Sequence, residues 1–593
     1  MPKCLTAILA TSAHSRGLGE SSRLNHSREV LYRTRRSGGF LALAIVGVFA
    51  FGSFPLFGQD ASISGIVKNK AGEPVSGALV KVASVDPGIG FMVVSQDQGR
   101  FNTPNLISGK YVVQAFGGGY QSASASPVDL TGVKQAKVDL TMSEPLKVTP
   151  PAQRLTDPEF ERLMPESDVA GVRHSMAHQC NECHTLERIV SARKTPEKWR
   201  ATIDRMRDYE IEDRHPLWIR FQEDGLLDRL WHEFLAKNLG PDTPQYPEVV
   251  TQWLLQPGTP AHPNRNWPSS LLSGAAAKYL TMEYSLPPGS GPRDVAVDSH
   301  GIAWIGEREA GMLGRFDAKT QTYSRIALPP AKNPTMRVSA IAVDAKDHVW
   351  FVDDGPNARI LEYEYNPQGG TFKSYPMPEF RWPAADEGWA RTGTLRFLDG
   401  FVWAAEEASD RILRLDPSTG KMVDYSIPRG SAPYGLAVGP NKTIWYAGLV
   451  GNSIVRLDPK TGRVEAHPVP TDRSELKALA ADSKLNLWAV ATDSGKLVRV
   501  DAKTGDVVEV ALPTENSGPF ALDVDTTRDL IWFSEVFADR IVRFDPSKNV
   551  FVEFPQPSAD SDVRRLEVDR SRPNRVWWIS TRGNKFGYIE VTE

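Results

Sequence analysis

The sequence predicts a multidomain, mainly β protein that combines a β-sandwich, a small all-α domain and a C-terminal seven-bladed β-propeller. The chain has 593 residues, more than the roughly 250–300 at which a single hydrophobic core stops growing. Tryptophan recurs in the C-terminal half at intervals of 42 to 53 residues, about the length of a propeller blade. Residues 61–143 instead alternate apolar and polar side chains in short runs, which is typical of a small sandwich.

The composition excludes several classes of protein. With 41% hydrophobic and 24% charged residues, the chain is globular rather than disordered. The formal net charge is −3, so no basic excess points to nucleic acid or to an anionic membrane surface. Three cysteines are too few for a disulfide scaffold.

The N-terminal segment predicts export. Arg33, Arg35 and Arg36 precede the apolar stretch 40–57, which ends at Gly58. We interpret residues 1–58 as a secretory signal or an uncleaved anchor, and expect a periplasmic or extracellular protein that meets a membrane only through residues 40–57. Cleavage near Gly58 also removes Cys4.

Residues 59–143 form the predicted sandwich. The runs 64–68, 78–82 and 111–115 are strand-like, with turns near 71–74 and 98–100. The pattern Gly65-x-Val67, Gly72-x-Pro74-x-x-Gly77 and Leu106-x-x-Gly109-x-Tyr111 resembles the carboxypeptidase regulatory-like domain. That resemblance implies a prealbumin-like sandwich without catalytic residues, sometimes supposed to bind carbohydrate.

Residues 168–241 are predicted to be helical, between the linkers 144–167 and 242–277. Thr195-Pro196 is a helix start signal, and Trp199, Ile203 and Met206 follow on one helical stripe. A second helix is expected through residues 226–235, before Gly240.

The helical segment contains Cys180-Asn-Glu-Cys-His184, the attachment signature of haem c. Cys180 and Cys183 are the only cysteines left after export, so we expect them to hold one haem covalently, with His184 as the proximal iron ligand. Three alternatives stay open: a thioredoxin-like redox pair, a strained disulfide, and a zinc site that also draws on His174 and His178.

The sixth iron ligand is less well defined by spacing, because Met206 also suits a core position on its helix. The run Arg193-Lys-Thr-Pro-Glu-Lys-Trp199…Arg205-Met206 resembles small cytochrome c modules related to the haem domain of quinohaemoprotein amine dehydrogenases. That resemblance implies an all-α cytochrome c domain with Met206 as the distal ligand. The substitutes are Met176, His178, His215 and His232.

Residues 278–593 carry the repeat. The seven tryptophans are Trp304, Trp350, Trp403, Trp445, Trp488, Trp532 and Trp577. Four short strands per repeat make a propeller blade. The last repeat ends after its third strand, so we expect strand 278–287 to supply the fourth and to close a ring of seven blades without open sheet edges.

The repeats resemble the streptogramin (virginiamycin B) lyase family through the element Trp-x-x-Glu, which ends here in Glu307, Glu406 and Glu535, with Asp353 in the corresponding place. The resemblance implies that histidines and glutamates act with a divalent cation. This chain has no histidine at those turns, where Arg293, Tyr434, Phe520 and Arg564 stand, and Ser580 replaces the late glutamate. We therefore do not carry the lyase activity over to this chain.

The four carboxylates come from equivalent places in their repeats, so we expect them to converge near the central channel. There they could bind a divalent cation or a positively charged substrate, or they could simply be solvated. The leading hypothesis is an exported cytochrome that exchanges electrons with a redox partner protein or a small-molecule donor, with the propeller as a recognition platform. The alternatives are a propeller enzyme, either a haem-coupled dehydrogenase or a divergent lyase, and a non-catalytic carbohydrate-binding scaffold.

Overall fold

The computed structural model describes residues 61–146, 193–200, 233–243 and 270–592. Short gaps within them fall at 86–87, 124–126, 355–356, 379–391, 429–430, 450, 472–473, 516, 559–560 and 582. The predicted export segment and the predicted haem ligands Cys180, Cys183, His184 and Met206 lie outside the described residues. No helix in the described ranges is long and apolar enough to cross a membrane.

Several strands of the N-terminal β domain alternate buried and more exposed side chains, as the sequence predicts, whereas residues 89–94 are buried throughout. Gly65 is required in β1, because a Cβ there would lie 1.8 Å from the carbonyl oxygen of Val138. The strands are β1 (Ser62–Asn69), β2 (Leu79–Ser84), β3 (Ile89–Val94), β4 (Arg100–Asn102), β5 (Lys110–Gly117), β6 (Tyr120–Ser122), β7 (Val128–Asp129), β8 (Gln135–Lys137) and β9 (Leu140–Pro145), with the 3₁₀ turn η1 (Asp97–Gly99).

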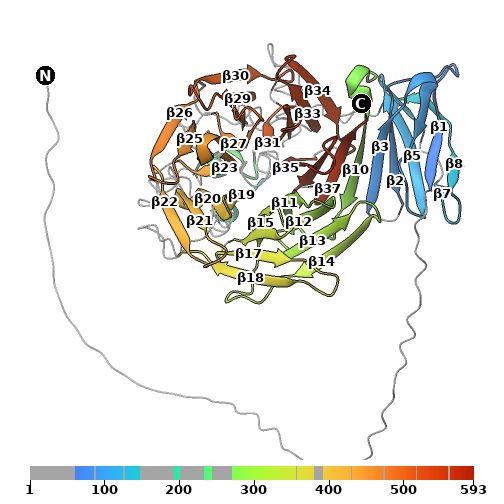
Figure 1. Ribbon diagram of the computed structural model, residues 1–593. Helices are drawn as coiled ribbons and strands as arrows, with labels where there is room; N and C mark the ends of the chain where they lie inside the picture. The colour runs from blue at the N-terminus through green and yellow to red at the C-terminus, as the bar shows by residue number, and fades with distance from the viewer. Residues whose placement is uncertain are drawn as a thin grey trace, which may run out of the picture. The chain divides into compact units, whose positions relative to one another are not determined.

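Six separate four-stranded antiparallel sheets follow around a ring (Figure 1). Their strands, in chain order within each sheet, are β11 (Pro292–Val297), β12 (Ile302–Glu307), β13 (Met312–Asp317) and β14 (Thr322–Ala327); β15 (Val338–Val343), β16 (Val349–Asp353), β17 (Arg359–Glu364) and β18 (Thr371–Pro376); β19 (Thr392–Leu398), β20 (Phe401–Glu406), β21 (Arg411–Leu415) and β22 (Met422–Ser426); β23 (Pro433–Val438), β24 (Ile444–Gly448), β25 (Ser453–Leu457) and β26 (Val464–Pro468); β27 (Leu476–Ala481), β28 (Leu487–Ala491), β29 (Lys496–Val500) and β30 (Val507–Ala511); β31 (Pro519–Asp525), β32 (Leu530–Glu535), β33 (Arg540–Asp545) and β34 (Val550–Pro555).

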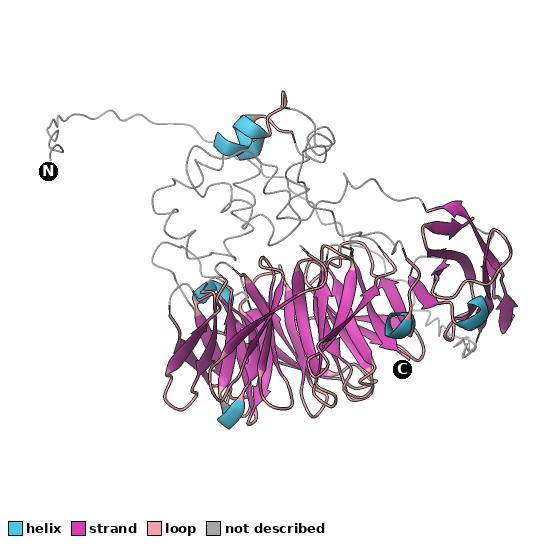
Figure 2. Ribbon diagram, turned by 90° about the horizontal axis from the view of Figure 1, so that it is seen from above, coloured by secondary structure: helices cyan, strands magenta, loops and turns pink. Residues whose placement is uncertain are grey.

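Strands account for most of the described chain, and the helical pieces are short (Figure 2). The repeated tryptophans all lie in second strands and are at most 3% exposed. They fill the space between neighbouring sheets. The spacing of the tryptophans in the sequence therefore matches the repeat of the sheets around the ring. The 3₁₀ turns of this region are η3 (Gly274–Ala277), η4 (Glu407–Ser409) and η5 (Pro440–Lys442).

The predicted seventh blade is not a separate sheet. Its strands are β35 (Val563–Val568), β36 (Arg575–Ser580), β37 (Lys585–Val591) and β10 (Tyr279–Ser285). As the sequence predicts, β10 pairs antiparallel with β37, and β35 contacts both β31 and β11, which closes the ring. The other edge of β10, however, pairs with β3 of the N-terminal domain.

These pairings merge the last four strands with the N-terminal domain into one 13-stranded sheet. The prediction of seven separate blades is therefore wrong: six four-stranded sheets stand alone. The sequence does not reveal this, because nothing in an isolated strand shows that a partner far along the chain will pair with its outer edge.

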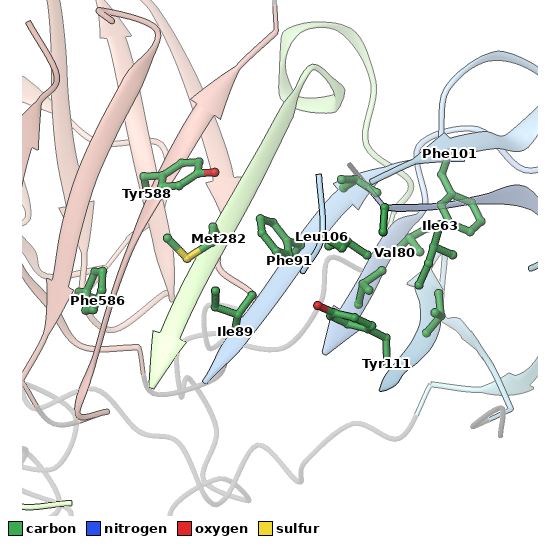
Figure 3. Close-up of a cluster of buried hydrophobic side chains, with 14 of the residues drawn as sticks. Ile63, Val80, Ile89, Phe91, Phe101, Leu106, Tyr111, Met282, Phe586 and Tyr588 are labelled. Carbon is green, nitrogen blue, oxygen red and sulfur yellow. The ribbon is translucent and has the colours of Figure 1, made fainter. Parts of the chain in front are cut away.

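Side chains, as well as main-chain pairing, join the N-terminal domain to the ring. Met282 on β10 lies opposite Phe91 on one side and Tyr588 on the other, and all three belong to one buried cluster that reaches from the sandwich into the ring (Figure 3). The ammonium of Lys81 donates to the carbonyl of Pro557 at 2.6 Å. The two parts consequently share a core.

Only short pieces of the expected helical domain are described. Residues 196–200 and 233–238 are helical, and the amide of Trp199 donates to the carbonyl of Thr195 at 2.9 Å, so the predicted helix start is confirmed. The indole of Trp199 donates to the carbonyl of Leu239 at 3.0 Å and joins the two pieces. Nothing in these residues shows a haem domain.

The ring closure is testable at Gly587. A Cβ there would lie 2.0 Å from the carbonyl oxygen of Met282 and 2.6 Å from the indole of Trp578. We expect Gly587→Ala to push β37 away from β10 and to lower the free energy of unfolding by about 1–3 kcal/mol, measured by urea denaturation. Gly109→Ala is the control, because its nearest neighbour is Tyr111 at 3.9 Å. Equal stability of Gly587→Ala and wild type would contradict the ring closure.

Candidate functional site

The first strands of the six four-stranded sheets, together with β35 of the 13-stranded sheet, surround the central channel and define its two ends. Each second strand runs antiparallel to its first strand, so Glu307 lies opposite Pro292 and Glu535 opposite Pro519. We call the end where the first strands begin the N-side, and the end where they finish the C-side. All four predicted carboxylates are on the N-side.

Two of these carboxylates are ion-paired inside their own sheets. Glu307 accepts hydrogen bonds from the hydroxyl of Tyr323 at 2.7 Å and from Nε of Arg325 at 2.8 Å. Burial opposes ionisation there, but hydrogen bonds from Arg325 and its neighbours outweigh it and lower the pKa of Glu307. Asp353 accepts from Nε of Arg359 at 2.9 Å. Burial dominates in this case and raises the pKa of Asp353.

The other two carboxyl groups have no cation bonded to them. Glu535 accepts from the hydroxyl of Ser517 at 2.9 Å, and its second oxygen has no hydrogen-bond partner in the described structure. Burial, reinforced by the carboxylate of Glu553, raises the pKa of Glu535 to about 8. Glu406 repeats this arrangement, since it accepts from Thr392, leaves one oxygen without a partner, and has its pKa raised by burial.

The shared cation site stays a prediction; in the described structure each carboxyl group is bonded to residues of its own sheet or of the segment that leads into it. The described residues hold no group of three or more His, Cys, Asp or Glu side chains that could bind a metal ion. The physical reason is the sheet itself: Glu307 and Asp353 bond to later strands of their own sheet, while Glu406 and Glu535 bond back toward the start of theirs.

An aromatic and cationic cluster instead occupies the N-side of the channel. The rings of Tyr434 and Phe520 meet edge to face with centroids 6.4 Å apart. Lys477 lies 4.1 Å and the guanidinium of Arg564 lies 4.9 Å from the centroid of the Phe520 ring, within the range of cation–π attraction. Val536 and Phe537, which follow Glu535, belong to the same buried cluster. The sequence singled out Tyr434, Phe520 and Arg564; it gave no signal for Lys477.

The cations of this cluster are themselves paired. Lys477 lies 3.0 Å from a carboxylate oxygen of Glu475, and Arg564 lies 2.9 Å from Asp562. Both pairs are almost completely buried. The cluster thus presents aromatic surface and compensated charge rather than a free positive centre.

None of the propeller histidines that the structure describes lies in this cluster. His300 is exposed and pairs with Asp347, His348 bonds to Glu362 at 2.8 Å, and His467 stacks on Trp445.

Arg565 crosses the channel between the two ends. Its guanidinium donates to the carbonyl of Gly393, lies 3.4 Å from Asp294, and sits 5.7 Å from the centroid of the Tyr434 ring. These contacts join residues of four first strands or their neighbours. A cavity of about 700 Å³ lies on the C-side of Arg565, where burial and the neighbouring Asp523 raise the pKa of Glu567 to about 8.

Fold and site together define an N-terminal β domain joined to a propeller whose N-side carries an aromatic cluster and two carboxyl groups, Glu406 and Glu535, whose pKa values burial raises. Residues 381–593 match the virginiamycin B lyase family, and residues 62–143 match the carboxypeptidase regulatory-like domain. The chain therefore contains a carboxypeptidase regulatory-like domain and a propeller of the virginiamycin B lyase type. No curated protein matches.

Solved structures with similar chains include a streptogramin B lyase, 24% identical with a TM-score of 0.47, which covers 54% of this chain and 100% of its own. Virginiamycin B lyase from Staphylococcus aureus is 22% identical with a TM-score of 0.46, and covers 53% of this chain and 100% of its own. A catalytically inactive histidine-to-alanine variant of the latter, with quinupristin, gives the same values.

The raised carboxyl pKa values predict how stability depends on pH. Glu535 and Glu567 keep their protons up to about pH 8 in the folded chain, whereas an ordinary glutamate loses its proton near 4.5. Between these values the folded state binds more protons than the unfolded state, so the free energy of unfolding falls as pH rises, by of the order of 1 kcal/mol per pH unit for each group.

Urea denaturation across this pH range measures the slope. We expect Glu535→Gln and Glu567→Gln each to make the slope shallower, since an amide does not titrate. Glu465→Gln, on the exposed strand β26, is the control and should keep the wild-type slope. Stability that rises with pH across this window would contradict the raised pKa values.

Proposed function

We propose that this protein is an enzyme of the virginiamycin B lyase-like propeller type. Its substrate binds over the N-side aromatic cluster, and Glu535 transfers a proton to or from that substrate. The observation that carries the proposal is the carboxyl group of Glu535, which is buried beside Phe537, bonded through one oxygen to Ser517, and without a partner at the other oxygen.

The pKa of Glu535 suits this role. A general acid or base is most effective when its pKa lies near the working pH, and burial raises the pKa of Glu535 to about 8. The Ser517 hydroxyl holds one carboxyl oxygen and leaves the other to exchange a proton. A lyase breaks a bond by elimination, so it needs a base that removes a proton and an acid that protonates the leaving group.

Glu406 supports a two-group arrangement. It has the same pattern of one hydroxyl bond, one oxygen without a partner, and a raised pKa. Glu307 and Asp353 differ because Arg325 and Arg359 bind them directly. The carboxyl groups of the Trp-x-x-Glu elements therefore divide into two structural and two chemically available groups.

Turnover of quinupristin, followed by mass spectrometry, tests this role. We expect Glu535→Gln to lower kcat by about 10²–10⁴-fold, the usual contribution of general acid–base catalysis, because the amide keeps the Ser517 contact but cannot transfer the proton. With Glu535 as the base, wild-type kcat/KM should rise with pH up to about 8.

Glu465→Gln, on an exposed outer strand, is the matched control and should retain activity. Wild-type protein that leaves quinupristin intact, or Glu535→Gln with undiminished turnover, would contradict the proposal. Circular dichroism of each variant separates lost chemistry from lost folding.

We also propose a second function, one-electron transfer by a covalent haem c, because a specific motif favours it. Cys180-x-x-Cys183-His184 has the spacing for two thioether links and a proximal histidine. Met206 is the proposed distal ligand, and a thioether there raises the reduction potential. Mature chains with no cysteine outside this motif have no competing thiol for attachment.

The intact mass and the pyridine haemochrome spectrum of exported protein test haem attachment. We expect the added mass of one haem in wild type and its loss in Cys180→Ala, because one thioether link is removed. Cys4→Ala, which lies in the predicted signal, should leave attachment unchanged. Mature protein with free thiols, or with zinc bound in place of haem, would refute this second function.

A further inference from the structure

Three of the N-side carboxyl groups face an arginine directly across their sheet. Each ends a second strand, and the register pairs it with the first residue of the third strand. The pairs are Asp353 with Arg359, Glu406 with Arg411, and Glu535 with Arg540. Directly opposite residues of an antiparallel pair have Cβ atoms about 4.5–5.5 Å apart. Each arginine is therefore placed within reach of its carboxyl group.

Equal placement does not lead to equal bonding. Nε of Arg359 donates to Asp353 at 2.9 Å. Arg540 is turned to the fourth strand instead, where its Nη1 donates to Glu553 at 2.6 Å and to the hydroxyl of Thr514 at 2.8 Å. The same hydroxyl donates to the other oxygen of Glu553 at 2.6 Å. Arg540 is thus held on the outer side of its sheet by two groups that bond to each other.

One position of the fourth strand accounts for the difference between the sheets. It lies opposite the third residue of the third strand. Its occupants, in chain order, are Arg325, Ser374, Asp424 and Glu553. Arg325 supplies a cation to the channel carboxyl of its sheet, and Ser374 brings no carboxylate that competes for Arg359. Asp424 accepts from Arg411 at 3.3 Å, as Glu553 accepts from Arg540.

The two sheets with an acidic residue at this position are the two in which the channel carboxyl keeps an oxygen without a partner among the described residues. These carboxyl groups are Glu406 and Glu535. In the other two sheets the channel carboxyl bonds to a guanidinium. The fourth-strand residue therefore separates the channel carboxyl groups into two sets.

We propose that Glu553 is a positioning residue for Glu535: it holds Arg540 at the fourth strand, so that the carboxyl group of Glu535 keeps one oxygen available for proton transfer. Asp424 acts in the same way on Arg411 for Glu406. This inference rests on the proposed role of Glu535, and it assigns the residue that keeps that group available. Glu553 does so from an outer strand, two strands away from the carboxyl group that it controls.

The charged groups that act on Glu535 come from its own sheet. The carboxylate of Glu553 raises the pKa of Glu535, and the guanidinium of Arg540 lowers it. Charged side chains on the neighbouring sheets and on the loop after β32 are already bonded. They are Lys477 with Glu475, Lys496 with Glu509, Arg564 with Asp562, and Asp539 with Ser561. Without the charge of Glu553, Arg540 would therefore find its carboxyl partner in Glu535, directly opposite.

The proton on Glu535 can be followed in the full-length protein, without substrate, by infrared spectroscopy. A protonated carboxyl group absorbs apart from a carboxylate, and subtracting the spectrum of the same protein with Glu535→Gln isolates this one group. We expect the wild-type band to titrate near pH 8. Glu553→Gln should lower the midpoint by about 1–3 pH units, the effect of a guanidinium brought next to a carboxyl group. The pH profile of kcat/KM should move down by the same amount.

Two further variants identify Arg540 as the agent. The double variant Arg540→Gln/Glu553→Gln should titrate close to wild type, because the guanidinium is removed together with the group that holds it. Glu509→Gln is the matched control. Glu509 bonds to Lys496 at 2.7 Å in the equivalent place of another sheet, where the second strand ends in Ala491. It should leave the titration of Glu535 unchanged.

The reverse substitution tests the same rule in another sheet. Ser374 is exposed, and Ser374→Glu places a carboxylate where Glu553 stands in its own sheet. We expect it to draw Arg359 away from Asp353 and to raise the midpoint at which Asp353 titrates, measured against the same protein with Asp353→Asn. This variant provides the readout if Glu553→Gln does not fold.

Several results would overturn the assignment. These are a wild-type midpoint in Glu553→Gln, a double variant that shifts as far as Glu553→Gln alone, or an unchanged midpoint of Asp353 in Ser374→Glu. The infrared titration needs no turnover, so the two proposals can fail separately. Wild-type protein that leaves quinupristin intact while the midpoints shift as expected refutes only the proposed function. Normal turnover with unshifted midpoints refutes only the role of Glu553.

Discussion

The strand β10 is the constraint on which the rest of the structure depends. One edge pairs with β37 and closes the ring, and the other pairs with β3 and continues into the sandwich. Both edges of a strand that would otherwise expose unpaired amides are thereby satisfied. Because the first strands hold their positions only in a closed ring, both ends of the channel depend on this one strand and on the absence of a side chain at Gly587.

The channel shows how burial and pairing sort identical side chains into different chemical states. Hydrogen bonds from Arg325 and its neighbours outweigh burial and lower the pKa of Glu307, whereas Glu535 is hydrogen-bonded to Ser517, and burial raises its pKa to about 8. The guanidinium of Arg565, which contacts Gly393 and Asp294, lies between the N-side cluster and the C-side cavity.

Much of the fold was open to prediction because its signals are local. The spacing of the seven tryptophans identified the second strands, and the strand near the start of the ring was correctly expected to pair with the last. The site was less predictable. The element Trp-x-x-Glu is the same at Glu307 and Glu535. In the structure, however, Glu307 accepts a hydrogen bond from Arg325 on a later strand, whereas Glu535 accepts one from Ser517, which precedes the first strand of its sheet.

The sequence by itself determined the strand period, the N-terminal β domain, the ring closure and which residues stand at the N-side, since alternation, turn residues and repeat length are properties of short segments. Only the tertiary structure decided that β3 pairs with β10, that Arg325 bonds to Glu307, and that Ser517 bonds to Glu535. Those outcomes depend on the distance between groups far apart in the chain, and on how much water reaches them.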